Sequence, residues 1–209
     1  PLDNTLTPIE NANKYFARYN KLKRTYDAGT RLIAEIKDEI MYLESIINAL
    51  DIATTENDLN NIKEELAVTG YIKKSGKSKN KGNSHNKPMH YISSDGFDMY
   101  VGKNNIQNDE LTFKFATGGD WWFHAKQMPG SHVIVKSDGR ELPDKTYEEA
   151  AALAAYYSKG RDLEKVEVDY VLKKEVKKPA GAKPGFVVYY TNYSLIAIAD
   201  ISGIKLVSE

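Results

Sequence analysis

The chain has 209 residues, and its 29 lysines and arginines balance 29 aspartates and glutamates, which gives a formal net charge of zero. This balance excludes the global positive field by which some proteins attract nucleic acid over their whole surface. The absence of cysteine excludes disulfide bonds and thiolate metal sites and suits a reducing cytosol, so we expect a cytoplasmic protein. No apolar run approaches the roughly 18 residues of a membrane span, so no membrane insertion is expected. The chain starts Pro-Leu-Asp, without an initiator methionine or a signal peptide, and we expect it to be a piece of a longer protein.

Charge is distributed unevenly along the chain and divides it into three parts. Residues 1–72 carry 8 basic and 12 acidic side chains, residues 73–87 carry six lysines and no acid, and residues 88–209 carry 15 basic and 17 acidic side chains. The middle part has no apolar residue and is rich in Gly, Ser, Asn and Lys, the composition of a flexible linker. We therefore expect a helical stalk over 1–72, a basic linker over 73–87 and a globular domain over 88–209. The linker is either simply solvated or a mobile arm that holds RNA phosphates through counterion release.

A long helix is predicted at the start of the chain. Thr7 is a suitable N-cap, Pro8 fits the first helical position and Glu10 fits the third. Apolar residues then recur at alternating spacings of four and three over about five heptads, which predicts a coiled-coil helix from residue 8 to residue 51. The seam consists of Tyr15, Tyr19, Leu22, Tyr26, Gly29, Ile33, Ile36, Ile40, Leu43, Ile47 and Leu50.

A short second helix is predicted to return along the first. Residues 54–57 look like a turn with a new N-cap, and Leu59, Ile62 and Leu66 give a helix that ends at Gly70. This helix can cover only the end of the long one. The tyrosine-rich first half therefore needs a coiled-coil partner, from a missing N-terminal part of the protein or from a second chain. Such a helix serves as a structural stalk, as a reach element that places the next domain at a distance, or as both.

The remaining residues predict an α+β domain with a mostly antiparallel or mixed sheet. Strands are expected over 89–94, 99–101, 120–125, 131–136, 166–172, 186–191 and 194–199, the first two joined by the turn at 94–96 and the last two by the turn at 192–193. A helix is expected to begin near Lys145, with Thr146 as its cap, and to stop at Gly160.

Three asparagines precede a short helix that is expected over residues 111–115. Asn104, Asn105 and Asn108 are well suited to cap it, because asparagine side chains accept hydrogen bonds from free backbone N–H groups. Asparagine amides also bind a ribose or a base edge, so these residues are secondary candidates for RNA binding.

Residues 120–132 contain both tryptophans and two of the four histidines. In a strand, Asp120, Trp122 and His124 share one face, and the turn at 129–130 brings His132 back near His124. Either the aromatic rings belong to the core and the histidines support the turn, or this face recognises a ligand. The candidate binding residues of this stretch are Asp120, Trp122, His124, Lys126 and His132.

A second candidate lies in residues 173–185. Five lysines surround one glutamate there, and prolines and glycines hold the segment as an extended loop. Lysines on a stiffened loop lose less entropy when they bind a phosphate than lysines on a flexible tail. We select Lys177, Lys178 and Lys183 as phosphate contacts, and the other possibility is a solvated loop. Near an aromatic face they would form the usual pair for RNA, with cations for the backbone and rings for exposed bases. The sequence does not show that the two stretches are close.

An enzyme is the less favoured alternative. Asp120, Asp169, Glu175 and Lys177 suggest a metal-dependent nuclease centre only weakly, because Glu-x-Lys is common in a chain this rich in both residues. His124 and His132 supply at most half of a metal site. No phosphate-binding loop, dinucleotide fingerprint or nucleophile elbow is present, so we expect no catalytic residues, no metal and no cofactor.

Three strings carry a resemblance to a known family. They are Asp-x-Trp-Phe-His-Ala-Lys-x-x-Pro-Gly-Ser-His over residues 120–132, Gly-Lys-Asn-Asn-Ile-Gln-Asn-Asp over 102–109, and Lys-Lys-Pro-Ala-Gly-Ala-Lys-Pro-Gly over 177–185. Together they resemble the NFACT-R domain over roughly residues 88–207, and the helices before it are similar to the end of the coiled-coil region of the NFACT family. These proteins are ribosome-quality-control tailing factors, which in Gram-positive bacteria are also called fibronectin-binding proteins.

The resemblance implies a function for the parent protein. It would bind a large ribosomal subunit that carries an obstructed nascent chain, and recruit tRNA so that an alanine-rich C-terminal tail is added without mRNA. The residues that select tRNA in the family lie in an N-terminal domain that this chain lacks. This chain would supply the stalk and a module that binds tRNA, rRNA or the ribosome. The family's other name implies the alternative, a fibronectin-binding surface adhesin displayed by a non-classical route.

Overall fold

The computed structural model describes residues 1–73 and 87–208 of the chain. The chain divides into two compact units, residues 1–41 and residues 42–209. The segment that the sequence predicts as a basic linker lies, apart from its first and last residues, outside the described residues.

The first unit contains an N-terminal turn and the first part of helix α1 (Pro8–Ile52). The backbone N–H of Thr7 donates to the Glu10 carboxylate at 2.7 Å, and the backbone N–H of Glu10 donates to the Thr7 hydroxyl at 3.3 Å. These reciprocal bonds confirm the predicted start of the helix. The apolar seam side chains from Tyr15 to Ile40 are between 45% and 75% exposed, so no part of the chain that the structure describes buries this face. No helix of the described residues has an apolar segment long enough to cross a membrane.

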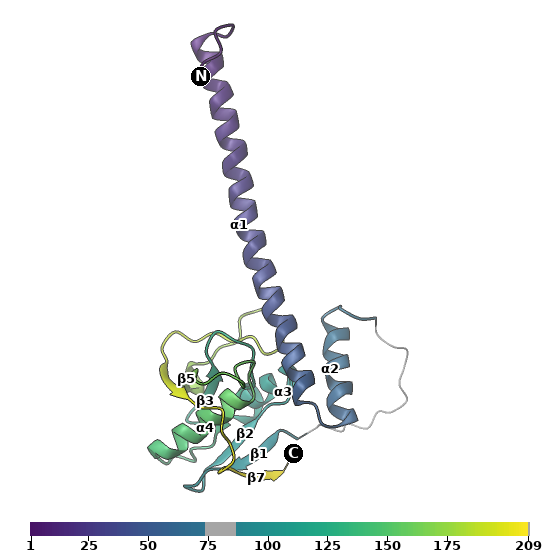
Figure 1. The fold of residues 1–209 in the computed structure, drawn as a ribbon, viewed down its shortest axis with the longest axis vertical. Coiled ribbons are helices and arrows are strands. Elements are labelled where there is room, and N and C mark those ends of the chain that lie inside the picture. Colours follow the sequence, from purple (N-terminus) through teal and green to yellow (C-terminus); the bar gives the residue numbers. More distant parts are fainter. Residues whose placement is uncertain (74–86, 209) are drawn as a thin grey trace. The chain divides into compact units, whose positions relative to one another are not determined.

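Helix α2 (Glu56–Val68) packs against the end of α1, as Figure 1 shows. Thr55 caps α2 through a capping box with Asp58, which agrees with the predicted turn. The buried contact is formed by Tyr42, Ile46, Ala49 and Ile62, with Leu66 at its margin. The predicted seam is therefore wrong at this end of α1. Its residues Leu43, Ile47 and Leu50 are 37%, 58% and 46% exposed, because the buried face lies one position earlier.

The second unit also contains a seven-stranded antiparallel sheet, which confirms the α+β fold class. The strands are β1 (Met89–Ile92), β2 (Asp98–Val101), β3 (Trp121–Ala125), β4 (Val133–Val135), β5 (Val166–Leu172), β6 (Tyr193–Ala197) and β7 (Lys205–Ser208). Their order across the sheet is β6-β5-β3-β4-β2-β1-β7. The central pair β3–β4 aligns Trp122 with Ile134, and β3–β5 aligns His124 with Asp169.

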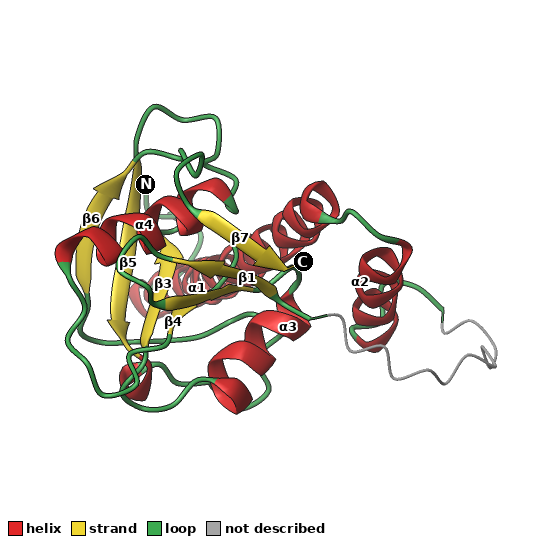
Figure 2. Ribbon diagram, turned by 90° about the horizontal axis from the view of Figure 1, so that it is seen from below, coloured by secondary structure: helices red, strands yellow, loops and turns green. Residues whose placement is uncertain are grey.

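Each face of the sheet has its own apolar core. Helix α4 (Asp144–Tyr156) covers the face that carries Phe123, Val133 and Val168, and Figure 2 shows it crossing the strands at the β6 and β5 side. The opposite face carries Trp122 and is covered by helix α3 (Asn105–Glu110), the π-helical turn Leu111–Phe115 and the loop that follows β5. Both faces of the central strands are buried, which is why residues 121–125 hold apolar side chains at adjacent positions.

Two predicted strands differ from the structure. Residues 186–191 form no strand and take part in one isolated bridge, between Lys177 and Val188. The strand expected to pair with them, β6, pairs with β5 instead. Strand β7, which pairs with β1, was not predicted.

Two predicted helix starts also differ. Thr146 does not cap α4, because its hydroxyl contacts Ser93 and Asp95, and Pro143 holds the cap position. The helix expected over residues 111–115 begins earlier, at Asn105, and residues 111–115 continue it as a π-helical turn.

Candidate nucleic-acid interface

The three sequence motifs meet at helix α3. The side-chain oxygen of Asn108 accepts the backbone N–H of His132 at 3.0 Å, and Asp109 accepts the backbone N–H of Gly185 at 3.2 Å. Asp109 also accepts a hydrogen bond from the Lys178 ammonium at 2.6 Å. The structure thus shows the proximity that the sequence could not show, and we call this meeting point the motif junction (Asn105, Asn108, Asp109, His132 and Gly185).

Gly185 allows a close approach in the motif junction. Its φ of +78° lies in the left-handed region, and a Cβ atom at this position would lie 2.5 Å from the side-chain oxygen of Asn105. Any other residue would therefore face both backbone strain and a collision.

The motif at residues 102–109 also connects the sheet domain to α2 and to the end of α1. The Asn105 amide donates to the Ser45 hydroxyl at 2.7 Å and to the Glu65 carboxylate at 2.9 Å. Lys103, in the same motif, forms a buried ion pair with Asp58 at 3.6 Å. Buried polar groups need such partners, because an unpaired one costs about 1–3 kcal/mol.

The asparagines of this motif are therefore structural in the fold as it stands. Asn104, Asn105 and Asn108 are each at most 5% exposed. Asn104 caps α3 by accepting the backbone N–H of Gln107, as the capping interpretation predicted for this residue. Contact of these amides with a ribose or base would require the motif junction to open.

The expectation that Trp122 and His132 lie on the surface is wrong. Trp122 is 0% exposed and His132 is 1% exposed. The Trp122 ring stacks on His124 at 5.5 Å between ring centroids and meets the edge of His132 at 5.1 Å. The physical reason is that the loop after β5 covers this face of the sheet, with Tyr189 against Trp122 at 5.3 Å.

The two histidines are kept neutral by burial. Loss of water contact lowers the pKa of His124 to about 4, and it holds the pKa of His132 well below the usual value, with His124 adding to the effect. The His132 ring nitrogen Nδ1 lies 2.8 Å from the Thr112 hydroxyl. His124 is half-buried and is the only member of this ring cluster of three (Trp122, His124, His132) that reaches the surface.

The two charged candidates of the same stretch have partners within the chain. Asp120 is 1% exposed and accepts hydrogen bonds from Lys136 and from the backbone of Thr117 and Ser137. Burial alone would raise the pKa of Asp120, but these bonds outweigh it and lower the pKa. Lys126 is partly exposed and pairs with Glu167 at 2.5 Å.

Two of the three carboxylates of the nuclease alternative, Asp120 and Asp169, accept hydrogen bonds from other groups of the chain. Asp169 accepts hydrogen bonds from the hydroxyls of Tyr189 and Ser194 at 2.7 and 2.5 Å and from Asn192 at 2.8 Å. In the described part of the chain, no group of three or more His, Asp or Glu side chains is arranged to hold a metal ion.

Two of the three selected lysines face inward. Lys178 binds Asp109 and also donates to the backbone carbonyl of Lys183 at 2.8 Å. The Lys183 ammonium lies over the Tyr42 ring at 4.5 Å and donates to the Tyr71 hydroxyl at 3.0 Å. These two cations hold the loop on the protein, whereas Lys177 is exposed.

Three further cations of this basic run form what we call the lysine ridge (Lys173, Lys174 and Lys177); Lys174 and Lys177 are exposed, and Lys173 is partly exposed. Lys173 lies over the Phe113 ring at 5.8 Å, and the backbone of Lys174 donates to the Gly118 carbonyl at 3.4 Å. Among the described residues, no carboxylate forms an ion pair with these three lysines. The sequence contained this signal, since Lys173 and Lys174 belong to the same basic run, but it did not distinguish inward from outward lysines.

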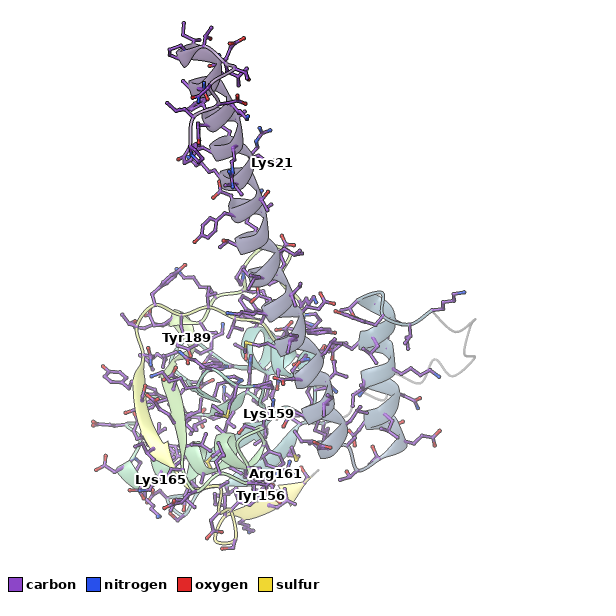
Figure 3. The ribbon with its side chains drawn as sticks, turned by 45° about the horizontal axis from the view of Figure 1, so that its top comes forward. Lys21, Tyr156, Lys159, Arg161, Lys165 and Tyr189 are labelled. Carbon is purple, nitrogen blue, oxygen red and sulfur yellow. The ribbon has the colours of Figure 1, made fainter. Side chains whose placement is uncertain are left out.

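A second basic group lies in the connection after α4, and sequence reasoning did not select it. Figure 3 labels its members Lys159, Arg161 and Lys165 together with Tyr156. Arg161 lies over the Tyr156 ring at 5.1 Å, and Lys159 pairs with Glu44 at 2.5 Å. Because acids alternate with these cations in the sequence, this group is a weaker anion site than the lysine ridge.

Comparison with known proteins gives matches to two family models and to similar proteins. Residues 1–85 match the family model described as NFACT N-terminal and middle domains, and residues 87–191 match the model described as NFACT protein RNA binding domain. Two similar proteins are both named Rqc2 homolog RqcH. The one from Streptococcus suis is 47% identical over 189 residues, which is 90% of this chain and 34% of that protein. The one from Bacillus subtilis is 40% identical over 202 residues, which is 96% of this chain and 35% of that protein.

A solved structure shows the same fold. It is described as the C-terminal of the fibronectin/fibrinogen-binding protein from Streptococcus suis, and it matches with a TM-score of 0.81 and 43% identity, covering 94% of this chain and 78% of that one. The chain spans about a third of the length of the curated relatives. On the match of its larger part to the RNA-binding-domain model, and on the resemblance of all three motifs, the chain belongs to the NFACT family.

Proposed function

We propose that this chain is the stalk and RNA-binding module of a ribosome-quality-control factor. In this proposal the whole protein binds an obstructed large ribosomal subunit and tRNA in the cytoplasm and supports mRNA-independent alanine tailing. The chain itself holds RNA or the ribosome and performs no catalysis. The names of its relatives and the match to an RNA-binding-domain model support this role.

The observation that carries the proposal is the lysine ridge. Lys174 and Lys177 are exposed, and Lys173 is partly exposed and lies over the Phe113 ring at 5.8 Å, a ring that is itself partly exposed. Cations that neutralise phosphates next to rings that stack on bases are the usual means of holding single-stranded RNA. The ring cluster and the two inward lysines, Lys178 and Lys183, have a structural role, because their contacts hold the loop that carries the lysine ridge.

Charge reversal tests this proposal. We expect the triple variant Lys173→Glu, Lys174→Glu, Lys177→Glu to lose RNA affinity about tenfold or more at low salt. The slope of log affinity against log salt concentration should become shallower by about 2, since each phosphate contact on single-stranded RNA contributes about 0.7. The measurement is titration of labelled tRNA and of purified large ribosomal subunits at several salt concentrations.

The matched control reverses three exposed lysines outside both basic groups, Lys63, Lys145 and Lys205, and so changes the net charge equally. If both triple variants bind tRNA and large subunits equally well, the lysine ridge has no specific role. The role in tailing is tested in the full-length factor, where the ridge variant should reduce alanine tails on stalled chains.

A second candidate function rests on one comparison, the description of the similar Streptococcus suis structure as a fibronectin/fibrinogen-binding protein. Fibronectin binding by this chain that survives both high salt and ribonuclease treatment would favour an adhesin. Binding that either treatment abolishes would instead show non-specific attraction of the basic ridge for a polyanion.

A further inference from the structure

Strand β6 forms an unguarded edge of the sheet. In the described residues it pairs with β5 on one side and with no strand on the other, and Figure 2 shows it at the margin of the sheet. Its sequence, Tyr193 to Ala197, contains no charged residue and no proline. Tyr193 and Ile196 are 63% and 68% exposed. Soluble proteins usually protect such edges with charges, prolines or bulges, so a bare apolar edge indicates a docking function.

A hollow of about 540 Å³ opens beside this edge, between β6 and the start of α4. It is lined by Trp121, Asp144, Tyr147, Glu148, Tyr170, Tyr193, Leu195 and Ile196. Its four rings contact one another, with centroids 5.1 Å apart for Trp121 and Tyr147 and 5.4 Å apart for Tyr170 and Tyr193. Trp121 is thus the tryptophan of the motif that is not fully buried, and it lies on the face opposite to Trp122.

The hollow is electrically negative. Asp144 and Glu148 line it, and the nearby cation Lys145 engages Glu148 at 3.2 Å. Burial raises the pKa of the Tyr147 hydroxyl to about 12, and Tyr170, Glu141 and Asp144 add to the rise. Aromatic rings with carboxylates at their margin bind cations, through the negative faces of the rings and through charge.

We propose that β6 and this hollow receive a basic peptide segment of another protein. The segment adds to the sheet as an extended strand on β6 and inserts a lysine or arginine side chain among the four rings. Backbone hydrogen bonds to the edge supply affinity, and the hollow supplies selection for the cation. RNA is disfavoured as the occupant because the hollow is acidic. A second copy of this chain is disfavoured because it would bring two acidic margins together.

The test uses the 209-residue chain and synthetic seven-residue peptides of alternating threonine and valine with one central variable residue. Amide chemical shifts are followed by nuclear magnetic resonance during titration. We expect shifts at β6 and at the start of α4, with lysine and arginine peptides binding about tenfold more tightly than the glutamine peptide and the glutamate peptide binding weakest. N-methylation of alternate peptide amides should abolish binding, because it blocks pairing with the edge.

Two matched variants test whether the peptide binds at β6. Ile196→Lys puts a repelling charge on the edge and should weaken binding of the lysine peptide about tenfold, whereas Val207→Lys, the same change at a 47% exposed position on the opposite edge strand β7, should leave it unchanged. Both variants should bind tRNA like the unmodified chain.

Three results would overturn the proposal: equal affinity for the lysine, glutamine and glutamate peptides, displacement of the lysine peptide by tRNA, or a dimer without peptide that Ile196→Lys dissociates. The last result would assign the edge to a second copy. None of these outcomes depends on the lysine ridge, so this inference and the proposed RNA binding fail independently.

Discussion

Single polar side chains hold the centre of this fold together. Glu65 is fully buried, and burial raises its pKa, with the nearby Asp109 contributing. Its oxygen Oε1 accepts hydrogen bonds from Asn105 and Tyr42, while Oε2 has no hydrogen-bond partner among the described residues. A buried carboxyl group with only part of its bonding capacity filled depends strongly on each bond that remains.

Replacement of Asn105 by alanine tests this dependence. We expect Asn105→Ala to lower the free energy of unfolding by about 2–3 kcal/mol, because Glu65 loses one of its two hydrogen-bond donors and Ser45 loses the amide that donates to it. Urea denaturation at pH 7 measures the loss. Asn60→Ala, at an exposed position of α2, is the control and should change stability by less than about 0.5 kcal/mol. Equal effects of the two changes would show that the Asn105 contacts add little.

Buried His132 and half-buried His124 predict a dependence of stability on pH. His124 and His132 have lowered pKa values in the fold, so the unfolded chain binds more protons than the folded one below the ordinary histidine pKa of about 6.5. Stability is therefore complete above this pH and falls as the pH decreases from 6.5 toward 4. The expected slope reaches about 1.4 kcal/mol per pH unit for each histidine.

Urea denaturation at pH 7.5, 6 and 5 measures this slope. His132→Gln should be less stable than the unmodified chain at pH 7.5, because the contact with Thr112 is altered. Its stability should nevertheless fall less steeply between pH 6 and pH 5. A slope that stays the same in this variant would rule out His132 as a source of the acid sensitivity.

At the scale of elements, the end of α1 shows what fixes the face of a helix. The heptad pattern favours Leu43, Ile47 and Leu50, yet the buried face holds Tyr42 and Ile46. The Tyr42 hydroxyl reaches Glu65 at 3.0 Å, and Ser45 reaches Asn105, so polar contacts with α2 and α3 set the rotation of this part of the helix.

Adjacent isoleucines give a direct test of this rotation. Ile46 is 4% exposed and Ile47 is 58% exposed. We expect Ile46→Ala to cost about 2–4 kcal/mol and Ile47→Ala to cost less than about 1 kcal/mol, because only the first removes buried methylene groups. Thermal unfolding of the two variants side by side decides the matter, and a larger loss for Ile47→Ala would restore the face predicted by the heptads.

Local signals predicted much of the fold, and long-range pairings were what the sequence could not show. The caps at Thr7 and Thr55 and the strands around Trp122 depend on residues close in sequence, so their patterns were readable. Thr146 was misread as a cap because its partners, Ser93 and Asp95, lie more than fifty residues away and make an equally good hydroxyl contact.

The sequence predicted which motifs form the candidate site, but it did not predict which of their side chains are exposed. Its motifs were recognised and do meet, but alternation within a strand cannot tell a covered face from an open one. Trp122 is therefore buried by a loop that the sequence predicted as a strand. In the same way, a run of lysines does not show that Lys178 points to Asp109 while Lys177 points to solvent.

For the molecule as a whole, the end of the helical pair belongs with the sheet. Residues 42–209 form one compact unit, and the buried ion pair of Lys103 with Asp58 lies within it. A chain that begins at residue 42 should therefore keep the thermal unfolding midpoint of this unit. A chain that begins at residue 88 should lose stability, because the Lys103 ammonium would lose its partner Asp58 and the Asn105 amide would lose its partners Ser45 and Glu65. Calorimetry of the three lengths measures this, and equal midpoints for the chains starting at 42 and 88 would contradict it.

The tight approach of Gly185 to Asn105 has a consequence for mutational scanning. A screen that scores only survival or function would find both positions intolerant of nearly every substitution, and the pattern would look like ligand recognition. The intolerance instead records the steric fit between the Gly185 backbone and the Asn105 side chain, so such a map needs a parallel measurement of protein abundance before it is used to draw a binding footprint.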